Sequence, residues 1–195
     1  MNRVVFVCLT LLLFFVAGCT TAIVPPPKAA HPATVYVTNY GRHSSLLLPE
    51  DNDHWVEYAF GDWEWFAQWH KSSSGVFRAF FFSKYSCLGR REIKLAGATT
   101  QSDDAVAQRI GSKVCESVLV PRDRADTLRT QLDDLHHAHI DTVIFNPNVR
   151  LWFVKYRGGY WLFHNCNQET ADWLRSLGCQ IHGTAMFSTF RVRER

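Results

Sequence analysis

The sequence has no run of basic residues and little net charge. Its 195 residues include 21 Lys and Arg against 18 Asp and Glu, which gives a formal net charge of +3 at pH 7 with His neutral. Proteins that hold nucleic acid do so with clustered Lys and Arg that neutralise phosphates. A bias this weak gives no argument for a nucleic-acid partner, and we expect none.

The sequence also has no group of residues at the spacing of a metal site. His136, His137 and His139 come at the end of an expected helix. Neighbouring side chains on a helix point in different directions, and histidines at its end suit the negative end of the helix dipole. No second group of ligands accompanies them. We therefore expect no metal and no other cofactor.

No apolar run is long enough to span a membrane comfortably, since a transmembrane helix needs about 20 apolar residues. The stretch 4–16 is apolar, follows the positive charge of Arg3, and leads through small residues into Cys19. This order resembles the lipobox of a bacterial lipoprotein, with a signal peptide over 1–18 and a lipid on Cys19. The other interpretation is an ordinary secretory signal that happens to end in cysteine.

The lipobox resemblance also implies a location. Thr20 follows Cys19, so there is no Asp in the position that retains such proteins at the inner membrane. In a Gram-negative cell, the resemblance implies a lipid anchor in the cell envelope, on the periplasmic face of the outer membrane. The lipid on Cys19 would then make the membrane a partner.

Prolines separate this leader from the part that we expect to fold. Residues 19–32 include three consecutive prolines, 25–27, and are predicted to form an extended Pro-rich tether. Residues 33–195, about 160 residues, are enough for one domain with its own core.

Strands and helices alternate in groups along this domain, which predicts an α+β class. Alternating apolar residues favour strands, and amphipathic spacing with caps favours helices. The expected strands are 34–38, 43–48, 55–60, 92–95, 115–120 and 186–192, with a hairpin of 151–156 and 160–163; the expected helices are 63–71, 76–85, 102–110, 121–137 and 166–177.

Four cysteines lie in the expected domain: Cys87, Cys115, Cys166 and Cys179. An oxidising compartment would permit disulfides, and four cysteines allow three complete pairings. Cys166 and Cys179 begin and follow one predicted helix, so they lie roughly 18 Å apart, too far for a bridge. We favour a bridge between Cys87 and Cys115, because Cys179 sits just past the helix end.

The stretch LFHNCNQET, residues 162–170, places a cysteine where a strand gives way to a helix. Asn165 is a suitable N-cap, and Gln168 can reach back to it. Cys166 would then lie in the first turn, where unpaired backbone N–H groups stabilise a thiolate and can receive an oxyanion. Cys166 is therefore predicted to be a nucleophile, with a buried inert thiol as the alternative.

A thiol nucleophile needs a base, and the base needs an orienting partner. His43 is the candidate base, because it opens a strand directly after a turn. Glu57 is the candidate orienting acid, because an acid is unexpected within an aromatic strand. Asp62 is the fallback orienting residue, and His164, two residues before the cysteine, is an alternative base or a site-shaping residue.

Aromatic residues gather just after the acid, at Trp63, Trp65, Phe66 and Trp69. Such a block fills a core more often than it lines a groove, so we favour core and keep a groove wall as the alternative.

Three blocks of the chain together resemble a known family. They are Val35-Tyr-Val to His43, Glu57-Tyr-Ala-Phe-Gly-Asp62, and Phe163-His-Asn-Cys-Asn167 with its following helix. They resemble a bacterial family of uncharacterised secreted proteins and lipoproteins and, more loosely, the circularly permuted NlpC-like group of papain-fold hydrolases and acyltransferases.

The resemblance implies a permuted papain-like antiparallel sheet packed against helices. It also implies that Cys166 is the nucleophile, His43 the base and Glu57 the orienting acid. This chain departs from the family at Arg42 and at Gln168-Glu169, and an acid beside the thiol would oppose thiolate formation.

Together these features predict an envelope cysteine hydrolase or acyltransferase that attacks an amide or ester. The compartment and the resemblance imply a peptidoglycan peptide as substrate first and an acyl lipid second. The alternative is a non-catalytic envelope lipoprotein that binds a peptide or protein partner in the same groove.

Overall fold

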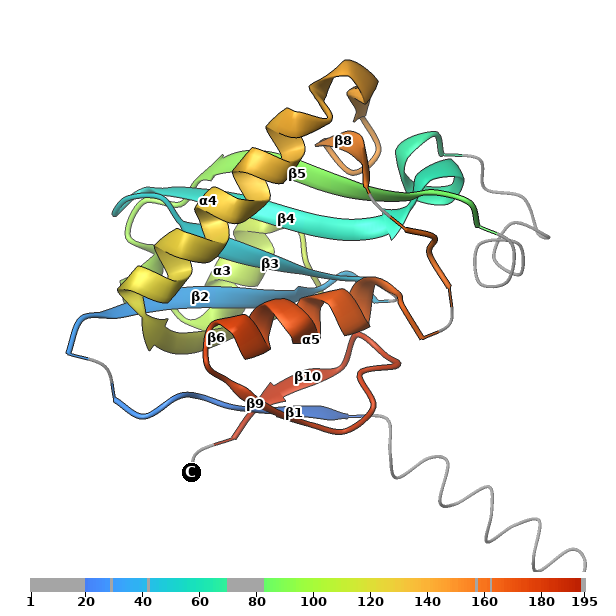
Figure 1. The fold of residues 1–195 in the computed structure, drawn as a ribbon. Helices are drawn as coiled ribbons and strands as arrows, with labels where there is room; N and C mark the ends of the chain where they lie inside the picture. Colours follow the sequence, from blue (N-terminus) through green and yellow to red (C-terminus); the bar gives the residue numbers. More distant parts are fainter. Residues whose placement is uncertain are drawn as a thin grey trace, which may run out of the picture.

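A seven-stranded antiparallel sheet forms the centre of the protein, with the strand order β6-β2-β3-β4-β5-β8-β7. The structure is a computed structural model that describes residues 20–28, 30–41, 43–69, 83–156, 158–161 and 163–193. A second sheet of three short strands has the order β10-β1-β9 (Figure 1). The strands are β1 (Thr21–Val24), β2 (Pro32–Asn39), β3 (Ser44–Pro49), β4 (His54–Asp62), β5 (Ser86–Lys94), β6 (Val114–Pro121), β7 (Ile144–Asn146), β8 (Leu151–Tyr156), β9 (Gln180–His182) and β10 (Phe190–Val192).

Helices cover both faces of the large sheet. In Figure 1, α4 and α5 lie in front of the sheet and α3 lies behind it. The helices are α3 (Asp103–Ile110), α4 (Arg122–Ala138) and α5 (Cys166–Ser176), with a π-helical turn η1 (Trp63–Ala67) and two 3-10 turns, η2 (Ala98–Thr100) and η3 (Ile140–Thr142). The protein is therefore mixed α+β, as the sequence predicts.

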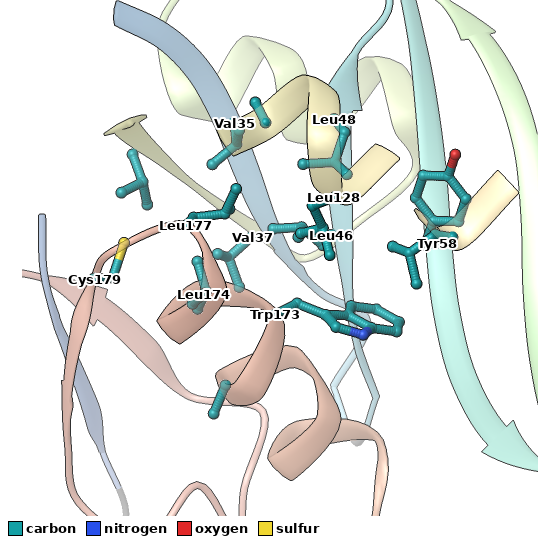
Figure 2. Close-up of a cluster of buried hydrophobic side chains, with 14 of the residues drawn as sticks. Val35, Val37, Leu46, Leu48, Tyr58, Leu128, Trp173, Leu174, Leu177 and Cys179 are labelled. Atoms are coloured by element: carbon teal, nitrogen blue, oxygen red, sulfur yellow. The ribbon is translucent and has the colours of Figure 1, made fainter. Parts of the chain in front are cut away.

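The face covered by α4 and α5 holds the main core. Alternate residues of the strands point toward these helices, because successive side chains of a strand point to opposite faces. Figure 2 shows the strand residues meeting Leu128 of α4 and Trp173 and Leu174 of α5. The strand residues on this face include Val35, Val37, Leu46, Leu48, Val56, Tyr58 and Phe60.

The opposite face of the sheet has two separate apolar clusters. One lies under α3 and contains Tyr36, Leu47, Trp55 and Ile110. The other lies against η1 and contains Ala59, Trp63, Ala67, Cys87, Leu151 and Phe153. Glu57 lies between Trp55 and Ala59 on β4, so its side chain points to this face at the position between the two clusters.

The predicted tether over 19–32 is corrected for part of its length. Thr21–Val24 forms β1, which pairs in parallel with β10 and antiparallel with β9. Ile23 is fully buried and belongs to the main core. An extended apolar tetrapeptide before the prolines is long enough for a short strand, so the folded part begins before residue 33.

The predicted hairpin of 151–156 with 160–163 is wrong. β8 pairs with β5 and β7 instead, and β5 runs from Ser86 rather than from residue 92. Among the described residues of the second segment, Trp161 forms an isolated bridge with His164 and no strand is assigned. The helix expected at 76–85 falls mostly in 70–82, and Cys19 with the leader falls in 1–19, both outside the described residues.

The predicted disulfide between Cys87 and Cys115 is also wrong. All four cysteines of the described chain are buried free thiols. Cys87 belongs to the cluster against η1, whereas Cys115 belongs to the cluster under α3. Within the described ranges, no helix has the length and apolar content needed to cross a membrane.

Candidate functional site

The start of α5 is capped as the sequence predicts. Asn165 is extended, with φ −120° and ψ 179°, and its side-chain oxygen accepts hydrogen bonds from the backbone N–H groups of Asn167 at 2.9 Å and Gln168 at 3.2 Å. The Gln168 side chain does not reach back, because it donates to the carbonyl oxygen of Thr184. The cap thus occupies two of the N–H groups that were expected to receive an oxyanion.

Cys166 is the first residue of α5, and it is only 2% exposed. Burial raises the pKa of its thiol, although the nearby backbone N–H of Ser44 and the Tyr160 hydroxyl act in the opposite direction. This is the reverse of the lowered pKa expected at a helix N-terminus, because desolvation outweighs the helix dipole here. The thiol is therefore protonated at neutral pH, and it lies 3.7 Å from the Asn167 side-chain oxygen.

The start of β3 packs directly against the start of α5. The Ser44 hydroxyl donates to the Asn167 side-chain oxygen at 2.9 Å, and the Ser44 backbone N–H lies close enough to the Cys166 sulfur to lower its pKa. Residues 43 and 166 are thereby brought near each other, since His43 directly precedes Ser44.

The His43 ring packs on Phe66, with ring centroids 4.6 Å apart. Its Nδ1 atom is buried and has no hydrogen-bond partner in the described part of the chain. Burial lowers the pKa of the imidazole to about 4. His43 is therefore neutral at pH 7, so the Cys166–His43 pair is not an ion pair at rest.

Glu57 is 1% exposed and already has several partners. One carboxylate oxygen accepts from the Tyr40 hydroxyl at 2.8 Å and from the Ser45 hydroxyl, and the other accepts from Arg91 Nε at 2.5 Å. These bonds hold Glu57 toward Tyr40 and Arg91. The structure therefore places the predicted orienting acid in a different network, and no described contact joins it to the His43 ring.

Asp62 lies on the other side of the site. It caps η1 by accepting from the Trp65 backbone N–H at 2.7 Å. Its charge also contributes to the raised pKa of Tyr160, after the larger effects of burial and of Cys166. Asp62 is thus near Tyr160 rather than in the Glu57 network.

Tyr160 is a site residue that the sequence reasoning missed. Its hydroxyl donates toward the Cys166 sulfur at 3.8 Å, and its ring stacks on Phe60 with centroids 5.9 Å apart. The signal for it was weak: a tyrosine after Gly158-Gly159, six residues before the cysteine, which was assigned to a hairpin strand.

His164 is paired with the acid that was expected to disturb the thiol. Its Nε2 lies 3.1 Å from a Glu169 carboxylate oxygen, and its Nδ1 lies 3.1 Å from the Gly159 carbonyl oxygen. Because both ring nitrogens face acceptors, the protonated imidazole is favoured, and the hydrogen bond to Glu169 is the main cause of its raised pKa. Both ring nitrogens of His164 are thus engaged by other acceptors, which leaves neither one free to take the proton of Cys166.

A cavity of about 450 Å³ opens beside His43, within the ~300–1,000 Å³ range of ligand pockets. Glu57, Tyr40 and Arg91 form its polar part. Trp65, Phe66 and Trp69 supply an aromatic wall, whereas Trp63 packs in the core cluster against η1. The aromatic block is therefore divided between core and cavity. The remaining lining residues are Ile110, Gly111, Asn148, Val149, Arg150, Leu151 and Phe153.

The predicted site residues therefore fall into two groups. His43 and Glu57 line the cavity, while Cys166 lies under Tyr160 at the start of α5 and is not among the described lining residues. Ser44 and Ser45, successive residues of β3, contact the two groups in turn. In the described part of the chain, no three His, Cys, Asp or Glu side chains come together as metal ligands.

Comparisons with known proteins do not assign the chain to a family or a function. No family model matches the chain, and no curated protein and no solved structure matches it significantly.

Proposed function

We propose that the protein is a cysteine hydrolase or acyltransferase in which Cys166 attacks an amide or ester carbonyl. One observation carries this proposal: the Cys166 sulfur, at the start of a capped helix, meets the backbone N–H of the residue that follows His43. Thiol catalysis needs a base near the nucleophile, and this contact brings the backbone next to His43 to the Cys166 sulfur.

The proposal includes a permuted papain-like arrangement of the fold. Two features support it. An antiparallel sheet packs against the helix that begins with the cysteine, and the chain order is histidine, acid and then cysteine.

The protonation states favour one order of events. A neutral thiol and a neutral imidazole would react by proton transfer during attack, which requires the His43 ring to turn from Phe66 toward the sulfur. The sulfur then forms a bond to the carbonyl carbon as His43 takes the thiol proton. His43 then gives this proton to the leaving amine or alcohol as the carbonyl–heteroatom bond breaks. The resulting thioester is resolved by water or by another acceptor.

Two donors near the sulfur suit the developing oxyanion better than the capped N–H groups of the helix. They are the Ser44 backbone N–H and the Tyr160 hydroxyl, which stays protonated because burial raises its pKa. Glu57, fixed by Arg91 and Tyr40, would shape the cavity floor rather than orient the imidazole.

We further propose a lipid on Cys19 and a place in the cell envelope, on the periplasmic face of the outer membrane. The substrate would be a peptidoglycan peptide or an acyl lipid.

A second function is favoured by a separate observation. The thiol is buried and protonated, and the cavity is lined by described residues that do not include it. A non-catalytic module that binds a peptide or protein partner needs the cavity but needs no reactive thiol beside it.

The alkylation rate of Cys166 against pH separates the two functions. We would use the chain from residue 20, which keeps β1, and follow each cysteine by peptide mass. His54→Ala is the matched control, since His54 is exposed and pairs only with Asp51 among the described residues. Catalysis predicts that Cys166 reacts faster than the other three buried thiols and that His43→Ala slows it selectively. Equal rates for all four thiols, unchanged in His43→Ala, would overturn the enzyme and leave the binding module.

A further inference from the structure

A groove lined by cationic side chains lies next to the cavity. Its volume is about 590 Å³. It follows β5 over residues 91–94, where β5 extends beyond its pairing with β8, and it is closed by the end of α3 and the start of β8. Its five cations and one acid are Arg90, Arg91, Lys94, Arg109, Arg150 and Glu92.

Part of this positive charge is not balanced. Arg90 pairs with Asp133 at 2.7 Å and with Glu92 at 3.0 Å, and Arg91 pairs with Glu57. The other three cations, Lys94, Arg109 and Arg150, have no carboxylate partner among the described residues. Arg109 donates instead to the Ala96 carbonyl oxygen and to Gln101. The groove therefore favours an anion.

The groove and the cavity share part of their walls. Arg91, Ile110 and Arg150 line both. Beyond Arg150 one wall of the cavity is apolar and aromatic, with Trp65, Phe66, Trp69, Val149, Leu151 and Phe153, while Tyr40, His43, Glu57 and Asn148 form its polar part. A single ligand can thus place a charged end among the cations and an apolar end against the aromatic wall.

Arg150 stands at this boundary in an unusual conformation. Its φ is 55°, in the left-handed region that disfavours residues other than Gly, Asn and Asp. The turn is held by the Arg150 N–H, which donates to the Asn146 carbonyl oxygen at 2.8 Å, and by the Asn146 side chain, which donates to the Phe66 carbonyl oxygen at 2.6 Å. Asn146 therefore ties Arg150 to the aromatic wall.

We propose that the groove and the cavity together bind a single-chain anionic amphiphile. Its carboxylate or phosphate head group pairs with Arg150 and Lys94, and its chain enters the cavity between Trp65, Phe66 and Phe153. Charge complementarity and the apolar continuation of the groove select this occupant. His43, the proposed base, also lines the cavity, but the binding rests on the cationic groove and the aromatic wall, so it goes beyond the proposed thiol chemistry and does not depend on it.

Charged residues along a strand edge also have a simpler use, because they prevent a second strand from pairing there. That use requires charge along β5 but gives no role to Arg150, which lies on the turn before β8. The two explanations therefore differ at Arg150.

The test measures ligand binding to the full chain by isothermal titration calorimetry, with each ligand kept below its critical micelle concentration. Octyl phosphate and octanoate carry both head and chain, inorganic phosphate carries the head alone, and 1-octanol carries the chain alone. Comparing the two octyl anions identifies the head group. We expect the better of them to bind at least about tenfold more tightly than inorganic phosphate, since burying two methylene groups gives about that gain. We also expect it to bind more tightly than 1-octanol and to weaken as salt is raised.

Variants complete the test. Arg150→Gln should weaken binding of the octyl anion about tenfold, because a charge-assisted hydrogen bond is lost. Arg175→Gln, an exposed arginine of α5, should leave it unchanged, and Cys166→Ser should as well. Each of four results would overturn the proposal: inorganic phosphate binds as tightly as the octyl anion, 1-octanol does so, Arg150→Gln binds the octyl anion as tightly as the unchanged protein, or the protein prefers an acidic peptide such as tetraglutamate. If the octyl anion binds as expected but Cys166 is alkylated no faster than the other thiols, only the proposed enzyme activity is overturned.

Discussion

Glu57 and Arg91 form a buried ion pair whose removal should be costly. Glu57 is 1% exposed, the Arg91 side chain is 12% exposed, and their atoms meet at 2.5 Å. Glu57→Gln keeps the size of the side chain but removes its charge. The carboxylate accepts from three donors, Tyr40, Ser45 and Arg91, and an amide has only one oxygen, so its NH2 group must face at least one donor.

The magnitude follows from what stays unpaired. Removing one partner of a buried pair costs about 3–5 kcal/mol, because the other charge stays buried. Arg91 keeps a hydrogen bond to the Tyr40 hydroxyl at 3.0 Å, so we expect the lower end, about 3 kcal/mol. A second variant, Glu57→Gln with Arg91→Met, removes the orphaned charge and should recover part of this loss.

The assay is urea denaturation, with the free energy of unfolding taken by linear extrapolation to zero denaturant. Asp172→Asn is the control, since its ion pair with Arg175 is exposed and worth at most about 1 kcal/mol. A loss below about 1 kcal/mol in Glu57→Gln would refute the reasoning, because it would mean that water reaches the pair. No recovery in the double variant would show that the hydrogen bonds rather than the charge carry the stability.

Three further changes have defined outcomes. Burial holds the pKa of folded His43 at about 4, below its ordinary value of 6.5, so the unfolded chain binds the proton first as pH falls. The free energy of unfolding should therefore fall as pH drops from 6.5 to 4, and urea titrations across this range should show a smaller fall in His43→Phe. The hydrogen bond to Glu169 raises the pKa of His164, so the stability that this pair contributes is fully present below pH 6.5 and is lost as pH rises through the raised pKa of the folded protein. Glu169→Gln should therefore lower the free energy of unfolding more at pH 6 than at pH 9. Ile23→Ala should cost about 2–5 kcal/mol, measured by the same denaturation, because this β1 side chain is fully buried; a loss near zero would make β1 dispensable.

The strands and helices that the sequence predicts best are those whose signals are local. The alternation of β-branched and aromatic residues along β2 and the Ser102 and Asn165 caps each need only a few neighbouring residues. β1 was not predicted, because four residues are too few to show a strand pattern and the prolines after them are typical of a linker. The strand at β8 was recognised, but its partners were not, because its pairing with β5 joins residues 62 to 70 apart in the chain, and no local turn signal indicates such a pairing.

The candidate site was predictable in its residue types and only partly in its arrangement. Asn165 and Cys166 follow from helix-start chemistry, and the cap is formed as predicted. The pKa of the thiol was predicted in the wrong direction, since the helix dipole is a local feature whereas burial depends on Tyr160 and β3 packing over it. Glu57 was expected to serve His43, but the register of β4 against β5 places it opposite Arg91, a cation that binds it first.

β3 explains how one site can have two separated halves. Successive side chains of a strand point to opposite faces, so Ser44 reaches Asn167 at the thiol while Ser45 reaches Glu57 at the cavity floor. The Ser45 hydroxyl is held further by Thr38 at 2.5 Å, which fixes this part of the strand against β2. A ligand that moved Glu57 would therefore also move Ser45, which is bonded to it. Ser44 is the next residue of the strand, so its N–H at the Cys166 sulfur would move as well. The backbone of β3 thus connects the cavity on one face of the sheet with the start of α5 and Cys166 on the other.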